Sequence, residues 1–174
     1  MLALSEVTLQ HTEQIITSCP NLSNLDVTDC KMRFDNGRAS EHANLLSISV
    51  VDSIFAGDQL AAFAARCKQL SNLTIELDND APLLFHFLAA KAWPALEQLR
   101  LATELPPRSI EGFTLLRFLT HCPALHSLTL PENSLGPAEA AAAVRAWQAT
   151  ERTAGRMMRL CIGDQEIAIP RAAR

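Results

Sequence analysis

The sequence predicts an α/β fold in which short strands and helices alternate and stack into a parallel sheet with helices on its other side. Three observations predict it. The spacing Leu-x-x-Leu-x-Leu, with other aliphatic residues allowed, recurs six times at intervals of 23 to 32 residues. A helical pattern precedes it, in the same phase, in four of the six places. Proline follows three of those helical patterns, at Pro20, Pro94 and Pro123, where it ends a helix.

The six strands are predicted by period-two alternation, which favours a short strand with one buried face. Their apolar positions are, in chain order, Leu22, Leu25 and Val27; Leu45, Ile48 and Val50; Leu70, Leu73 and Ile75; Leu96, Leu99 and Leu101; Leu125, Leu128 and Leu130; and Met157, Leu160 and Ile162. Leu2 and Leu4 share this register and predict the end of one further strand.

The helices are predicted by apolar stripes at i, i+3, i+4 and i+7 before a strand. The four stripes are Thr12, Ile15, Ile16 and Cys19; Leu60, Phe63, Ala64 and Cys67; His86, Ala89, Ala90 and Trp93; and Leu115, Phe118, Leu119 and Cys122. Before Leu45 and Met157 the stripe is interrupted by Asp35, Arg38 and Glu151, so we expect a short, displaced or irregular helix there. Residues 136–150 predict an alanine-rich helix that packs closely against the next layer.

Both ends of the array need covering, because terminal units expose core and a sheet edge. Residues 159–162, Gly163-Asp164 and residues 165–169 predict a strand, a tight turn and a return strand, with Pro170 as the stop. We expect this hairpin to cap the C-terminal side. The chain opens in mid-unit at Leu2, which favours an upstream segment over a partner as the cover of the other edge. We therefore expect residues 1–174 to form a single domain, as the C-terminal part of a longer protein.

Two segments carry a resemblance to a known family. Residues 19–30 read Cys-Pro-Asn-Leu-Ser-Asn-Leu-Asp-Val-Thr-Asp-Cys and resemble the cysteine-containing leucine-rich repeat of F-box and related proteins; residues 122–133 match the same frame. Residues 133–141 are similar to ribonuclease-inhibitor-type repeats. The resemblance covers nearly the whole chain and implies a leucine-rich-repeat solenoid of about six repeats, with a curved parallel sheet on the concave side and helices on the convex side. The frame's cysteine is replaced by His42, Trp93 and Ala154 in other repeats.

Composition excludes several functional classes. Because 48% of the residues are apolar and 20% charged, the chain is globular; with a net charge of −4 it offers no broad positive field for nucleic acid. No apolar run approaches the length of a membrane span, and we expect no membrane partner. The five cysteines do not suit a fully paired disulfide framework, so we expect the cytoplasm, with the nucleus as the alternative.

The sequence predicts no catalytic site, no cofactor and no metal. No nucleophile, base and orienting group are seen to converge, and no glycine-rich phosphate loop is present. His121, Cys122 and His126 suggest zinc ligands at first sight, but Cys122 is a core position of the helical stripe. Cys19 and Cys67 are expected to be small buried hydrophobes, Cys30 to pack under a turn, and Cys161 alone to face outward.

The candidate binding residues are the outward-facing positions of the strands. Those we select as protein-binding are Asp26, Ser49, Thr74, Glu76, Gln98, Arg100, Thr129 and Arg159. Acids lie toward the N-terminal half and arginines toward the C-terminal half, a charge pattern that could select a partner. The alternative is an ordinary solvated sheet face, because this set lacks the Tyr and Trp that binding hot spots favour. Arg100 is the strongest single candidate.

These observations leave two hypotheses of function. The first is a protein-recognition module, in which the resemblance implies the recognition part of an F-box-type ubiquitin ligase adaptor, although no segment of this chain resembles an F-box. The second is a structural subunit whose helical side and open N-terminal edge are buried permanently in a larger complex. An enzyme is disfavoured for want of a site. In either case the expected partner is protein.

Overall fold

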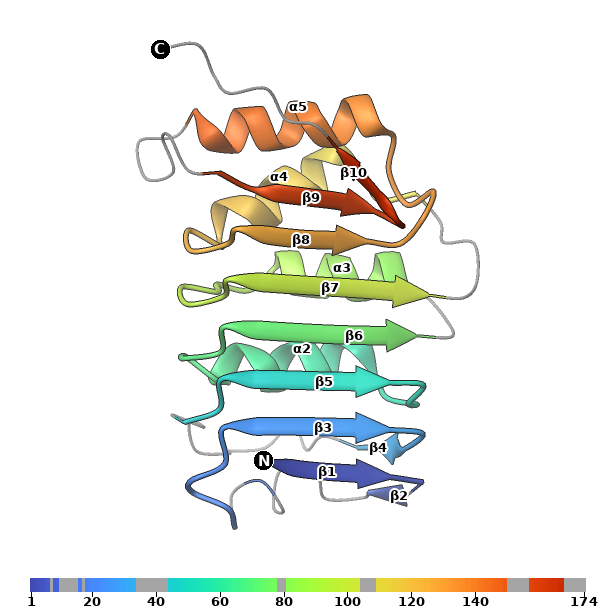
Figure 1. Ribbon diagram of the computed structural model, residues 1–174, viewed down its shortest axis with the longest axis vertical. Coiled ribbons are helices and arrows are strands. Elements are labelled where there is room, and N and C mark those ends of the chain that lie inside the picture. The colour runs from blue at the N-terminus through green and yellow to red at the C-terminus, as the bar shows by residue number, and fades with distance from the viewer. Residues whose placement is uncertain are drawn as a thin grey trace.

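The chain folds as an α/β protein built on a mostly parallel sheet (Figure 1). The computed structural model describes residues 1–6, 8–9, 16, 18–33, 44–77, 81–103, 109–149 and 157–167. Within them lie an eight-stranded sheet, a two-stranded sheet and four helices. None of the described helices has the length and apolar character that crossing a membrane requires.

The main sheet follows the chain in order, from one edge to the other. Its strands are β1 (Leu2–Ser5), β3 (Asn24–Thr28), β5 (Ser47–Val51), β6 (Asn72–Leu77), β7 (Gln98–Thr103), β8 (Ser127–Leu130), β9 (Arg159–Ile162) and β10 (Gln165–Ile167). All neighbours pair in parallel except β10, which returns antiparallel to β9. The six predicted strands are confirmed. The further strand is also confirmed, since Leu2 pairs with Leu25 and Leu4 with Val27.

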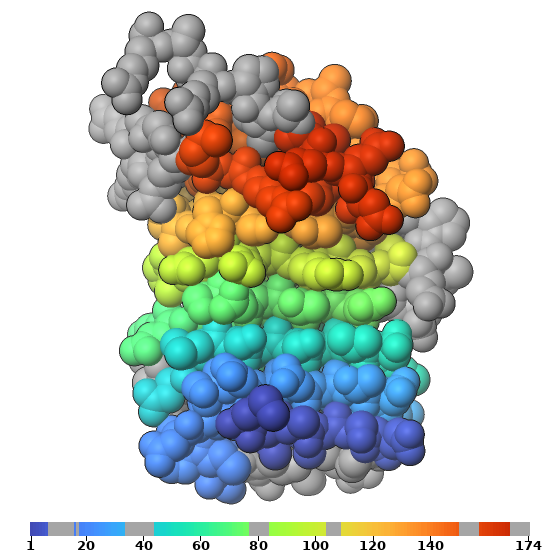
Figure 2. Space-filling view, viewed as in Figure 1, coloured from blue at the N-terminus to red at the C-terminus, as the bar shows by residue number. Residues whose placement is uncertain are grey.

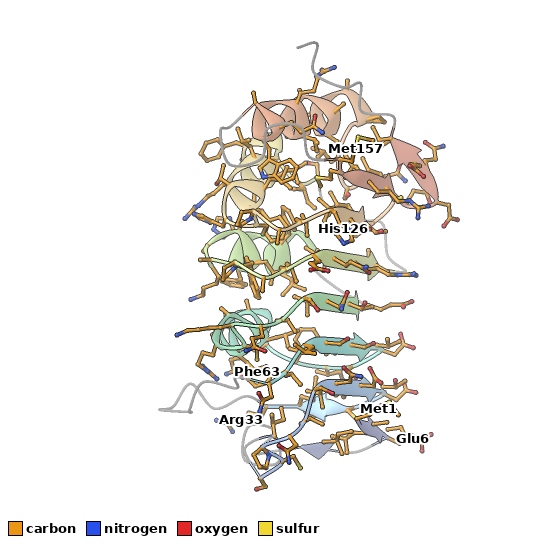
Figure 3. The ribbon with its side chains drawn as sticks, turned by 60° about the vertical axis from the view of Figure 1, so that its left-hand side comes forward. Met1, Glu6, Arg33, Phe63, His126 and Met157 are labelled. Atoms are coloured by element: carbon orange, nitrogen blue, oxygen red, sulfur yellow. The ribbon has the colours of Figure 1, made fainter. Side chains whose placement is uncertain are left out.

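The four described helices all lie on one side of the sheet, and none of them covers its other side (Figures 1 and 3). They are α2 (Gly57–Arg66), α3 (Ala81–Ala89), α4 (Gly112–Thr120) and α5 (Pro137–Gln148). Each helix contacts the next one along the chain, as each strand does. The predicted alanine-rich helix is therefore present as α5, with Ala140 and Val144 completely buried.

The core lies between sheet and helices and is filled by the predicted leucine positions. On β7, Leu99 and Leu101 are each 1% exposed, while Arg100 between them is exposed. Phenylalanines from the helices complete the layer: the rings of Phe85 and Phe118 have centroids 5.1 Å apart, a distance at which aromatic pairs attract. Alternation along the strand thus separates a buried face from an outward one.

The helical stripes are confirmed for α2 and α4, whereas for α3 two of the four predicted positions, Ala89 and Trp93, are buried and the other two are wrong. His86 and Ala90 are exposed, whereas Leu84, Phe85 and Leu88 are buried. The physical reason is that α3 ends at Ala89. Trp93 is buried from the following turn, where its indole N–H donates to the Leu88 carbonyl at 2.9 Å.

Two further predictions are wrong. Cys19 is exposed instead of buried, unlike Cys67 and Cys122 at the corresponding positions of later units. Met157 is 63% exposed and its neighbour Met158, at 7%, fills the core in its place. The predicted positions Thr12, Ile15, Asp35, Arg38, His42, Glu151, Ala154 and 168–170 lie outside the described residues.

A second, small sheet at the carboxyl ends of the first strands was not predicted. It pairs β2 (Thr8–Leu9) with β4 (Lys31–Met32) in parallel, and Lys31 bridges to Ile54. The turns before it use left-handed backbone at Glu6, Asp29 and Asp52, one residue after each main strand ends. The first three layers of the main sheet, β1, β3 and β5, therefore bend in the same way at the same place.

Candidate interaction surface

The outward side of strands β3 and β5 to β9, which we call the sheet face, carries all eight candidate residues. Figure 2 shows this face as parallel bands, one strand beside the next, and none of the described helices lies in front of it. Gln98, Arg100 and Arg159 are exposed. Asp26, Ser49, Thr74, Glu76 and Thr129 are half-buried, as expected for short side chains lying between neighbouring strands.

Strand register arranges these side chains in straight rows across the sheet. The middle row runs Asp26, Ser49, Thr74, Arg100, Thr129 and Cys161. The row on the amino-terminal side runs Asn24, Ser47, Asn72, Gln98, Ser127 and Arg159. Glu76 stands on the carboxyl-terminal side, opposite Ala102. Neighbours in a row are separated by one strand spacing, about 4.8 Å.

Ionisable groups on and beside the sheet face differ in whether they already have partners. Arg159 donates from Nε to Glu166 Oε2 of β10 at 3.2 Å, and His126 Nε2 lies 3.7 Å from Glu97 Oε2. These pairs are solvent-exposed, so each stabilises the fold only slightly. Over the described part of the chain, Arg100 and Asp26 take part in no ion pair. They are the charges of the middle row that remain available to a partner.

The cysteines do not form a site. All five are free thiols; Cys30, Cys67 and Cys122 are buried, and Cys161 is half-buried in the middle row. Burial raises the pKa of the Cys122 thiol far above its ordinary value, because a thiolate would be desolvated there. Cys122 is thus an uncharged core residue.

The suggested zinc ligands are engaged separately. His121 Nδ1 lies 3.2 Å from the Ala89 carbonyl oxygen, and His126 faces Glu97. Among the residues whose positions are described, no group of three or more His, Cys, Asp or Glu side chains could hold a metal ion.

The helical side carries one feature that sequence reasoning missed. Phe113, on the first turn of α4, is 73% exposed beside a shallow cavity of about 410 Å³. The cavity lies between α3 and α4 and is lined by residues that include His86, Glu111 and Arg117. The sequence could have indicated this feature, because Phe113 is an aromatic residue that lies outside the buried helical stripe of Leu115 and Phe118.

No protein-family model, no curated protein and no solved structure matches this chain. The likeness to leucine-rich repeats therefore rests on the spacing of its aliphatic residues.

Proposed function

We propose that this chain is a leucine-rich-repeat solenoid of the ribonuclease-inhibitor-like or cysteine-containing type, and that its sheet face recognises another protein. Strand order that follows chain order supports the repeat architecture, as does the contact of each helix with the next. The free thiols suit a reducing compartment, the cytoplasm or the nucleus. The proposal assigns no reaction to the chain.

One observation carries the proposal: the sheet face is a broad side with no helix over the described strands, and its outward rows contain unpaired Asp26 and Arg100. Charged groups that lack a partner within the chain can pair with a second protein without first breaking an internal contact. Arginine is also enriched at the centres of binding surfaces.

An extension of the proposal rests on the resemblance alone. It is that the recognised protein is a substrate held for an F-box-type ubiquitin ligase adaptor. The test is whether a captured partner is ubiquitinated in cells more strongly when the chain is present. An unchanged level would confine the chain to recognition.

The second candidate function is a structural subunit, and the exposed Phe113 favours it. A largely exposed phenylalanine beside a cavity suits burial against another subunit, and β1 leaves one edge of the main sheet without a described neighbour. In that function the helical side, rather than the sheet face, would carry the contact.

A photo-crosslinking experiment separates the two functions. A photoreactive amino acid is placed at Thr129 on the sheet face in one variant and at Phe113 on α4 in another, in cells that express the chain. The recognition proposal expects crosslinks to a discrete protein from position 129. Crosslinks from position 113 alone would overturn it and support the structural subunit.

A further inference from the structure

The middle row of the sheet face places two opposite charges on one line. Asp26 on β3 aligns with Ser49 on β5, then with Thr74 on β6, and finally with Arg100 on β7. Three strand spacings separate the charged residues, which is about 14 Å. The line runs across the strands.

The path between these charges is lined by short side chains. Ser49 and Thr74 carry hydroxyl groups that, in the described structure, make no hydrogen bond to another group. Each hydroxyl can both donate and accept, so a polypeptide backbone laid along the row could be satisfied at both positions. No large side chain of this row stands between Asp26 and Arg100 to block such a segment.

We propose that the sheet face takes an extended segment of its partner, laid across the strands, with a basic residue paired to Asp26 and an acidic residue paired to Arg100. This inference rests on the proposed function of the face. An extended chain advances about 3.3 Å per residue, so about four residues separate the two partner charges. Residues i and i+4 of an extended segment project to the same side, and both charges can therefore reach the sheet at once.

The surroundings favour a carboxylate over Arg100. Thr74 and Thr129 flank Arg100 in the row, and their hydroxyls can donate to the same anion that pairs with the guanidinium. Glu76 lies on β6, diagonal to Arg100, and would repel a carboxylate placed toward the carboxyl ends of the strands. An acidic residue of the partner is therefore disfavoured on the Glu76 side of the row.

The test uses labelled synthetic peptides of about nine residues and fluorescence polarisation. One peptide has Lys and Asp four residues apart in a background of Ser, Thr and Val; a second has them two residues apart. Two more carry Lys twice or Asp twice at the four-residue spacing. We expect the wild-type chain to bind the first peptide about three- to tenfold more tightly than the other three, as exposed ion pairs allow.

Charge-reversed variants provide a stricter test, because each of them should change which peptide the chain prefers. Arg100→Glu makes both ends of the row acidic and should prefer the peptide with two lysines; Asp26→Lys should prefer the peptide with two aspartates. Arg145→Glu changes an exposed arginine on α5 by the same charge and serves as the matched control, with the wild-type order of affinities expected. Thermal melts of all variants verify folding.

Two outcomes would overturn the inference: equal affinity for the two- and four-residue spacings, or a preference that Arg100→Glu leaves in place. Absence of binding to any peptide at millimolar concentration would overturn it as well. A different result would overturn the proposed function, so the two failures can be told apart. If position 129 crosslinks a protein whose binding ignores both charge reversals, the sheet face remains the binding surface and only the charge-pair assignment is lost.

Discussion

Leu99 and Arg100 are neighbours on β7 whose side chains face opposite ways, one into the core and one into solvent. Binding and stability should therefore respond to different substitutions within the same strand. That separation makes Arg100 a suitable residue for testing binding without disturbing the fold.

For Arg100→Glu we predict at least fivefold weaker binding of a natural partner that crosslinks from position 129, because a paired cation becomes a repelling anion. The melting temperature should change by less than about 2 °C, since exposed substitutions rarely alter stability much. Surface plasmon resonance and a thermal melt measure the two effects. Unchanged affinity with a normal melt would count against the sheet face.

Cys122 gives a prediction about thiol chemistry and pH. Because burial raises the pKa of its thiol, Cys122 should resist alkylation at pH 8, whereas exposed Cys19 should react within minutes. Above pH 9.0, the ordinary thiol value, the unfolded chain ionises at Cys122 while the folded chain does not. The free energy of unfolding should then fall with rising pH, by up to about 1.4 kcal/mol per unit from this group.

Two measurements examine this. Intact mass after brief alkylation should show Cys19 modified first, with Cys19→Ser removing that product. Urea melts between pH 8 and 10 should show a shallower loss of stability for Cys122→Ala than for the wild type. Rapid labelling of Cys122 in the native chain would mean that α4 does not bury it.

At the scale of the elements, the turn between β9 and β10 depends on one glycine. Gly163 has a φ of 56°, and an added Cβ would lie 3.0 Å from Glu132 Cβ. Left-handed backbone costs a residue with a Cβ about 1 to 2 kcal/mol. We therefore predict that Gly163→Ala lowers the melting temperature by about 3 to 6 °C.

The matched control is Gly136→Ala, before α5, where φ is −64° and an added Cβ meets nothing within 4 Å. Its effect should be near zero, since the loss of a good N-cap residue is offset by lower entropy of the unfolded chain. Differential scanning calorimetry compares the two variants. Equal melting temperatures would show that the hairpin does not contribute to the stability of the last strand.

Sequence patterns predicted the strands better than the helices, for a physical reason. A strand's alternation depends on residues one and two positions apart, so every predicted strand begins and ends within a few residues of the observed one. Predicting which helical residues are buried also depends on where the helix ends, and the end of α3 could not be predicted from the sequence. Because α3 stops at Ala89, the stripe that included His86 was displaced.

Some helix ends depend on contacts that no local pattern contains. The N–H of Gly112, which opens α4, donates to Glu139 Oε1 of α5 at 2.8 Å. The two residues are 27 positions apart, so neither the cap nor its effect on α4 could be predicted from neighbouring residues. The small sheet of β2 and β4 escaped prediction similarly, since strands of two residues have no periodicity.

For the molecule as a whole, the candidate surface could be predicted in part. Period two and a shared register were enough to place all eight residues on one face. The pair of Arg159 with Glu166 was not foreseen, because it depends on how β10 returns against β9. From the sequence alone, it could not be predicted that Arg159 forms an ion pair within the described part of the chain while Arg100 does not.

Because each strand packs against its neighbours, a charge introduced into the core should affect the folding of the whole chain. Leu99 is 1% exposed and β7 lies between β6 and β8. Leu99→Asp should leave the chain largely unfolded or insoluble, because an unpaired buried carboxylate costs several kcal/mol, a large part of a domain's stability. Circular dichroism and solubility measure this, with Gln98→Asp, outward on the same strand, as the control. A soluble Leu99→Asp chain that melts cooperatively would mean that the strand register is wrong.

Since each strand and helix contacts mainly its neighbours along the chain, nothing in the architecture fixes how many units it contains. Unequal recombination within the gene could add or remove a segment of strand and helix and still leave every remaining interface of the same kind. The distance from Asp26 to Arg100 would then change in steps of one strand spacing, about 4.8 Å. Selection could thereby adjust the reach of this surface to the length of a new ligand without redesigning the core.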